Sequence, residues 1–159
     1  MAEPPTDPSK TPASGWVDED AHEHVFPLRI YYEDTDAAGI VYYVNYLKFA
    51  ERARTEMLRI AGRGQDKMWR EEGLGFAVRS AQIDYRLPAR LDDMLDVRTR
   101  VVDIGGASLR LGQRLFRDQA LLADMTFRLA VIDREGRPAR LPADIRDALS
   151  PHAPDADGP

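Results

Sequence analysis

The sequence predicts an α+β fold in which a curved antiparallel sheet wraps around one long helix. Residues 45–61 have the period of a single amphipathic helix, whereas residues 76–131 contain segments in which apolar side chains alternate. Short connections between such segments make neighbouring strands antiparallel. A helix with one apolar face needs a sheet to cover it, so we expect the helix to lie against the sheet.

The first predicted strand is a short run of apolar and β-branched residues at 25–32, despite Pro27 near its start. The next segment, residues 33–39, is rich in residues that favour turns, and we expect a loop there. This loop therefore connects the first strand to the long helix.

The helix over residues 45–61 is predicted from apolar side chains spaced by three and four positions. They share one face: Tyr46, Ala50, Ala53, Met57 and Ile60. Asn45 is the predicted N-cap, and Gly62 is the predicted C-terminal stop. We also expect Arg52 and Glu56, four residues apart, to form an ion pair of modest strength.

A second, short helix is predicted over residues 65–72, ending at Gly73. The period then changes from helical spacing to alternation. Four strands are predicted, at residues 76–87, 95–101, 107–115 and 123–131. The alternation slips near Arg79 and Ser80, which predicts a β-bulge in the first of these strands.

Both ends of the chain differ in composition from its middle. Residues 1–24 and 150–159 are rich in proline and acidic residues and poor in large apolar ones. Such segments bury too little apolar surface to offset the entropy lost on ordering. We therefore expect two disordered tails around a folded unit at residues 25–149.

Composition excludes several classes of protein. With 159 residues, 43% of them hydrophobic, the chain is expected to form one globular domain. It has no cysteine, which excludes disulfide scaffolds, thiolate metal sites and cysteine nucleophiles. The net charge of −5 argues against nucleic acid as a partner, and no apolar stretch is long enough to span a membrane. We expect a cytoplasmic protein.

The densest group of reactive side chains lies between the first strand and the long helix. Glu33, Asp34 and Asp36 are three carboxylates within four residues, although acidic residues are also common in ordinary turns. The small residues at 37–39 allow a ligand to approach the backbone closely. The free N–H groups at the start of the helix can stabilise an oxyanion. A carboxylate beside such donors suits acyl-transfer hydrolysis, as nucleophile or as general base.

This run also resembles a known signature. Residues 31–46, YYEDTDAAGIVYYVNY, look like the motif of hotdog-fold acyl-CoA thioesterases, among them 4-hydroxybenzoyl-CoA thioesterase. Residues 49–59 (FAERARTEMLR) and 88–95 (PARLDDML) are similar to the Tol-Pal-system-associated branch. The resemblance covers about residues 26–148. It implies a hotdog fold and hydrolysis of acyl-CoA to free CoA and a carboxylic acid, with no metal or other cofactor.

The resemblance also implies a set of site residues. The catalytic carboxylate falls on Asp36, and the backbone N–H that polarises the thioester carbonyl falls on Tyr43. Tyr32 is expected to line the site, and Gly39 and Val41 to contact the substrate. The Tol-Pal branch commonly has histidine at the position of Tyr43. A backbone donor survives that change, because every residue except proline supplies an N–H.

Other carboxylates need to be weighed against this assignment. We expect Asp34 to order the turn and Glu33 to face solvent. Glu51 lies on the helix, where another hotdog branch has its catalytic carboxylate, but pairing with an arginine is the simpler expectation. Asp84 is expected to be solvated or to lie at an interface. Asp34 and Asp36 alone are too few ligands for a metal site.

The expected partners follow from the same reasoning. CoA phosphates would be bound by scattered cations, for which Arg79, Arg90 and Arg110 are candidates. Open sheet edges predict a homodimer or a dimer of dimers.

A second hypothesis for the function is a low-turnover acyl-CoA-binding or scaffold component of a Tol-Pal or lipid-synthesis complex. A hotdog dehydratase is a weaker third one, because those enzymes typically use a histidine and the three histidines, near the ends of the sequence, are expected to lie outside the core. Short aliphatic, long aliphatic and aromatic acyl groups are all compatible with the sequence.

Overall fold

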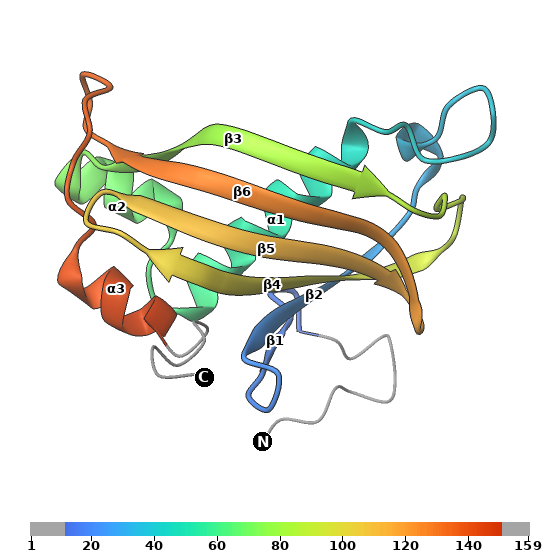
Figure 1. The fold of residues 1–159 in the computed structure, drawn as a ribbon, viewed down its shortest axis with the longest axis horizontal. Coiled ribbons are helices and arrows are strands. Elements are labelled where there is room, and N and C mark those ends of the chain that lie inside the picture. Colours follow the sequence, from blue (N-terminus) through green and yellow to red (C-terminus); the bar gives the residue numbers. More distant parts are fainter. Residues whose placement is uncertain (1–11, 151–159) are drawn as a thin grey trace.

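The structure is a computed structural model that describes residues 12–150. In this range six antiparallel strands form one sheet in the order β1-β2-β4-β5-β6-β3. The strands are β1 (Trp16–Asp18), β2 (Glu23–Arg29), β3 (Gly75–Tyr85), β4 (Met94–Ile104), β5 (Ser108–Arg117) and β6 (Ala120–Ile132). The helices are α1 (Asn45–Ile60), α2 (Gln65–Glu72) and α3 (Ala143–Leu149). Figure 1 shows α1 running along one face of the sheet, with α2 and α3 near one end.

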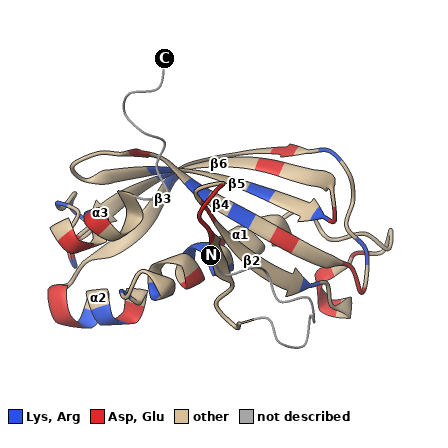
Figure 2. Cartoon of the chain, turned by 90° about the horizontal axis from the view of Figure 1, so that it is seen from below, with Lys and Arg blue, Asp and Glu red and all other residues tan. Residues whose placement is uncertain are grey.

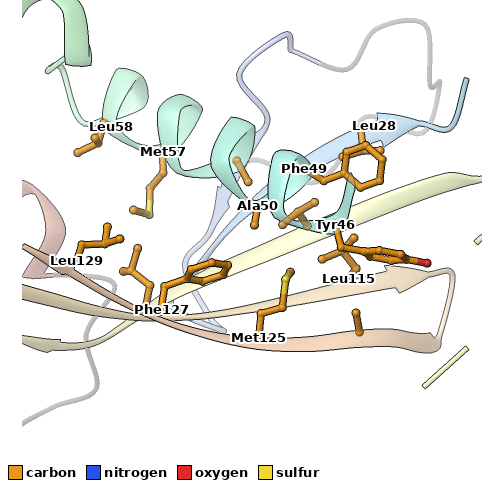
Figure 3. Close-up of a cluster of buried hydrophobic side chains, with 14 of the residues drawn as sticks. Leu28, Tyr46, Phe49, Ala50, Met57, Leu58, Leu115, Met125, Phe127 and Leu129 are labelled. Atoms are coloured by element: carbon orange, nitrogen blue, oxygen red, sulfur yellow. The ribbon is translucent and has the colours of Figure 1, made fainter. Parts of the chain in front are cut away.

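The core lies between α1 and the sheet. Figure 3 shows Ala50 and Met57 of α1 pointing towards β6, which carries Met125 and Phe127, while Phe49 lies beside Leu28 of β2. Phe49 and Phe127 are both almost fully buried. Truncating a buried phenylalanine to alanine typically costs about 3–5 kcal/mol. This packing fixes α1, and with it the loop that precedes α1, against the sheet.

The α+β architecture and the main elements agree with the sequence-based predictions. The helices at 45–61 and 65–72 and the four long strands are present, with boundaries shifted by a few residues. The predicted bulge is confirmed by a register shift between Val78 and Ser80 in the pairing of β3 with β6. Figure 2 shows basic and acidic segments interspersed over the helices and strands.

The N-terminal tail prediction differs from the structure for part of its length. Trp16–Asp18 form β1 and pair with β2, which begins at Glu23 rather than at residue 25. Glu23 is buried and forms an ion pair with Arg114 of β5. The pairing of β1 with β2 and the ion pair of Glu23 with Arg114 stabilise this part of the chain, which its composition alone did not indicate. Residues 1–11 and 151–159 of the predicted tails lie outside the described residues.

Details of the helices also need correction. Asn45 is the first residue of α1 and not its N-cap, which is Val44. The predicted pair of Arg52 with Glu56 is wrong, because Glu56 pairs with Arg59 instead. Ile60, predicted on the apolar face, is 41% exposed and is the last residue of α1.

The last helix, α3, was not predicted. It starts after Pro142 and buries Ile145 and Leu149. Two apolar residues four positions apart are consistent with a helix. In a segment of only seven residues, however, this spacing is too weak a signal to predict one.

Candidate active site

The loop between β2 and α1 is organised by Asp34. This side chain is buried in a short 3₁₀ helix, Tyr32–Asp34. Its Oδ2 accepts the backbone N–H of Tyr31 at 2.8 Å. Its carbonyl accepts the N–H of Tyr42 at 2.9 Å and the side-chain amide of Asn45 at 2.8 Å. The expectation that Asp34 orders the turn is therefore confirmed.

Asp36 begins a tight reversal of the chain. An isolated bridge pairs Thr35 with Val41, and the N–H of Asp36 donates to the carbonyl of Ile40 at 2.9 Å. Oδ1 of Asp36 accepts the N–H of Ala38 at 2.9 Å. Its Oδ2 accepts no hydrogen bond from residues 12–150. The half-buried carboxylate is thus held by one oxygen while the other is left available.

The turn depends on Gly39. Its φ of +76° lies in the left-handed region, where a side chain would strain the backbone, although a Cβ there would meet no atom within 4 Å. Gly39 is exposed, and so is Tyr32, at 83%. Val41, in contrast, is buried. Of these three predicted substrate contacts, two lie on the open surface of the loop.

A cleft of about 310 Å³ lies beside this loop. Its lining is mostly apolar and comprises Ile40, Val41, Tyr43, Tyr46, Tyr85, Arg86, Leu87 and Pro88. The cleft therefore brings together two of the predicted site residues, Val41 and Tyr43. Asp36, Gly39 and Tyr32 do not line it.

Tyrosine rings form one wall of the cleft. The ring of Tyr85 stands edge-to-face with those of Tyr46, at 5.3 Å between centroids, and Tyr43, at 6.3 Å. The hydroxyl of Tyr46 accepts the N–H of Ala89 at 3.1 Å, and that of Tyr85 donates to the carbonyl of Tyr43 at 2.8 Å. Burial raises the pKa of both Tyr46 and Tyr85, so both hydroxyls are protonated at neutral pH.

The backbone at Tyr43 offers a free donor. Tyr43 lies in the turn just before α1, and none of the hydrogen bonds among residues 12–150 uses its N–H. The preceding carbonyl, that of Tyr42, accepts the N–H of Asn45 at 2.9 Å. A free N–H at a helix start can donate to a developing negative charge on oxygen.

Glu51, the alternative carboxylate, is engaged elsewhere. It forms an ion pair with Arg54 one turn along α1, as expected. Arg54 is 5% exposed, donates to Oε1 of Gln113 at 2.8 Å and lies 4.4 Å from the ring centroid of Phe127. Burial lowers the pKa of Arg54, and the carboxylate of Glu51 acts in the opposite direction.

The cations that the sequence singled out are dispersed. Arg79 lies in the bulge of β3, Arg110 lies on β5 between two buried residues, and Arg90 lies in the connection from β3 to β4; all three are exposed. The arginine that lines the cleft is Arg86, which sequence reasoning missed. It pairs with Asp84 at 3.0 Å, and its position just after β3 gives no sequence signal that it lies beside the loop.

Residues 12–150 contain no cluster of three or more histidine, aspartate or glutamate side chains arranged to hold a metal ion. Within the same range, the search for a helix long and apolar enough to cross a membrane finds none.

One long helix wrapped by an antiparallel sheet, with a polar loop leading into the helix, defines the hotdog class of thioesterase-like proteins. Residues 31–149 match the description "Thioesterase-like superfamily". The chain therefore belongs to the thioesterase-like superfamily, which confirms the resemblance.

Two relatives and one solved structure give the extent of the similarity. The chain is 43% identical over 125 residues to the acyl-CoA thioesterase YbgC of Haemophilus influenzae, covering 78% of this chain and 92% of that protein. It is 41% identical over 122 residues to the acyl-CoA thioester hydrolase YbgC of Escherichia coli O6:H1, covering 76% and 90%. A probable thioesterase from Bartonella henselae superposes with a TM-score of 0.73 at 35% identity, covering 76% and 99% of the two chains.

Proposed function

We propose that this protein hydrolyses acyl-CoA thioesters to free CoA and a carboxylic acid. The observation that carries the proposal is a half-buried carboxylate, that of Asp36, in the same loop as the free backbone N–H of Tyr43. The relatives named acyl-CoA thioesterase and acyl-CoA thioester hydrolase, at 43% and 41% identity, support the choice of substrate class.

Asp36 is the reactive carboxylate of this proposal. As general base it takes a proton from water, whose oxygen attacks the thioester carbon; the C–S bond then breaks and the thiolate is protonated. As nucleophile it attacks the carbon itself and expels CoA, and water cleaves the resulting anhydride. The bond from Ala38 to Oδ1 orients the carboxylate and leaves Oδ2 for either step.

The N–H of Tyr43 polarises the thioester carbonyl. In the tetrahedral intermediate the carbonyl oxygen becomes negative, and a donor already aimed at it lowers the barrier without reorganisation. In this proposal Val41 meets the substrate within the adjoining cleft. Tyr32 and Gly39 meet it outside the cleft, on the exposed surface of the loop. Arg86 and Arg90 are the cations best placed, beside and near the cleft, to meet CoA phosphates.

The working unit in this proposal is a homodimer or a dimer of dimers, acting in the cytoplasm. β3 is an edge strand whose inward-facing Val78 is 51% exposed, although its partner across the ladder, Leu129, is buried. A second opening of about 590 Å³ separates α1 from β3 and includes Leu47, Ala81 and Phe127. A second copy paired along β3 would cover these apolar surfaces.

The test is a thiol-release assay with the full-length protein and CoA esters of short aliphatic, long aliphatic and aromatic acids. We expect wild-type turnover well above that of Asp36→Ala on at least one ester. Turnover no higher than that variant on every ester would contradict the proposal. That result would favour the alternative of a low-turnover acyl-CoA-binding or scaffold component.

A further inference from the structure

We infer that Tyr85 of β3 is a positioning residue for the reaction: its hydroxyl fixes the backbone that carries the Tyr43 N–H. The inference rests on the proposed function and adds a residue to it. The starting point is one hydrogen bond, from the hydroxyl of Tyr85 to the carbonyl of Tyr43, with an O···O distance of 2.8 Å. This bond joins segments that are 42 residues apart in the chain.

The bond completes a pair of constraints around Tyr43. On the N-terminal side, the carbonyl of Tyr42 accepts the N–H of Asn45 at 2.9 Å. On the C-terminal side, the carbonyl of Tyr43 accepts the Tyr85 hydroxyl. Each peptide unit is planar and trans, so the direction of its carbonyl also sets the direction of its N–H. With both flanking carbonyls bound, the two backbone dihedrals of Tyr43 are held.

The first constraint alone does not hold this turn. The Tyr42 carbonyl and the Tyr43 N–H belong to one peptide unit, which the bond from Asn45 orients relative to α1. The next unit lies outside the helix, and no other hydrogen bond among residues 12–150 engages the Tyr43 carbonyl. Without the Tyr85 hydroxyl, the backbone at Tyr43 is held within residues 12–150 only by the single bond from Asn45, and the turn that carries the Tyr43 N–H can shift. An N–H that moves in this way loses alignment with an oxyanion, where hydrogen bonds weaken steeply with angle.

Tyr85 is itself held firmly. Its ring is edge-to-face with Tyr46, which is 3% exposed and whose hydroxyl accepts the N–H of Ala89. The carbonyl of Ala89 in turn accepts the N–H of Val41 at 2.9 Å. The end of β3, the connection after it and the loop before α1 therefore form one hydrogen-bonded unit. Through its hydrogen bond, Tyr85 connects the turn at Tyr43 to strand β3 of the sheet.

The test compares Tyr85→Phe with Tyr31→Phe in the full-length protein. Both changes remove one hydroxyl and keep the ring, but the Tyr31 ring is 61% exposed and its hydroxyl makes no hydrogen bond with residues 12–150. We expect Tyr85→Phe to lower kcat about tenfold and to leave KM within about twofold, because the lost alignment matters most in the transition state. We expect Tyr31→Phe to match wild type.

Stability is controlled by measuring circular dichroism on heating and by assaying all variants at a temperature where each is fully folded. If Tyr85→Phe has wild-type kcat, the inference is overturned. If it raises KM while kcat stays unchanged, Tyr85 only forms a wall of the cleft and the inference is again overturned. Asp36→Ala separates this failure from that of the proposed function, because equal turnover in wild type and Asp36→Ala would reject the hydrolase itself.

Discussion

At the residue scale, two aspartates two positions apart differ in what their oxygens contact. Asp34 is buried, and its carboxylate and carbonyl both bind groups that hold the loop together. The carboxylate of Asp36 accepts only the nearby N–H of Ala38, and its other oxygen has no protein partner among the described residues. The difference in contacts, not in residue type, makes one of them structural and leaves the other available for chemistry.

Arg54 is a residue whose contribution to stability can be measured directly. Its guanidinium is buried against Phe127 and satisfies Oε1 of Gln113. Removing it leaves a buried acceptor unpaired and a gap in the core. We expect Arg54→Ala to lower the free energy of unfolding by about 2–4 kcal/mol in urea denaturation.

The control for this prediction is Arg52→Ala. Arg52 is an exposed cation on the same helix, 5.8 Å from the ring centroid of Phe49, and we expect a change below about 1 kcal/mol. A loss at Arg54 no larger than that at Arg52 would show that the buried network contributes nothing net to stability.

At the element scale, the connection from β3 to β4 supports the cleft. It is held by Asp93, whose Oδ2 accepts the N–H of Arg90 at 2.8 Å and the guanidinium of Arg117 at 2.6 Å. Burial acts to raise the pKa of Asp93, but these hydrogen bonds and the positive charge of Arg117 outweigh it. The pKa of Asp93 therefore lies below the usual value of an aspartate.

This shift has a defined pH dependence. A carboxylate whose pKa is lower in the folded state stabilises the fold above its unfolded-state pKa. That stabilisation is lost as the pH falls through the folded-state value. We expect Asp93→Asn to reduce the free energy of unfolding by about 1 kcal/mol at about pH 7, since the pair is partly exposed, and by less at about pH 3. An equal reduction at both values would contradict this account of the Asp93 interactions.

Several elements could be predicted from the sequence because their signals are local. The alternation in β3 to β6 and the three-and-four spacing in α1 reflect which side chains face the core, so the elements and the bulge near Arg79 could be inferred. β1 could not, because a strand of three residues has no readable period and depends on its pairing with β2.

The candidate site could be predicted only in part, for the same reason. The loop was identified by its composition and motif. The cleft wall needs Tyr85 and Arg86, which reach the loop through the fold and carry no signal of proximity in the chain.

At the scale of the whole molecule, the sheet is asymmetric. One edge strand, β1, is only three residues long, whereas β3, at the other edge, is eleven residues long and has inward-facing apolar side chains in partial contact with solvent. Long exposed edges favour pairing with another chain. The proposed dimer therefore uses β3 and covers the opening between β3 and α1.

This proposal predicts a change of oligomeric state on substitution of Val78. A charge introduced there would be buried and unpaired in the interface, so we expect Val78→Asp to weaken association about 100-fold or more. Size-exclusion chromatography with light scattering at several concentrations would measure this. Arg100→Asp, at an exposed position on β4, is the control and is expected to associate like wild type. A wild-type chain that is monomeric at micromolar concentration would contradict the dimer.

The central claim is that the free carboxylate oxygen of Asp36 takes part in the bond-breaking step. Its most direct test is kcat on the best acyl-CoA ester for wild type, Asp36→Asn and Glu51→Gln, with thermal midpoints measured in parallel. We expect Asp36→Asn to lower kcat by about 100-fold or more while remaining folded, and Glu51→Gln to keep kcat within about threefold. If Glu51→Gln abolishes turnover and Asp36→Asn does not, the reactive carboxylate lies on α1 and this account is wrong.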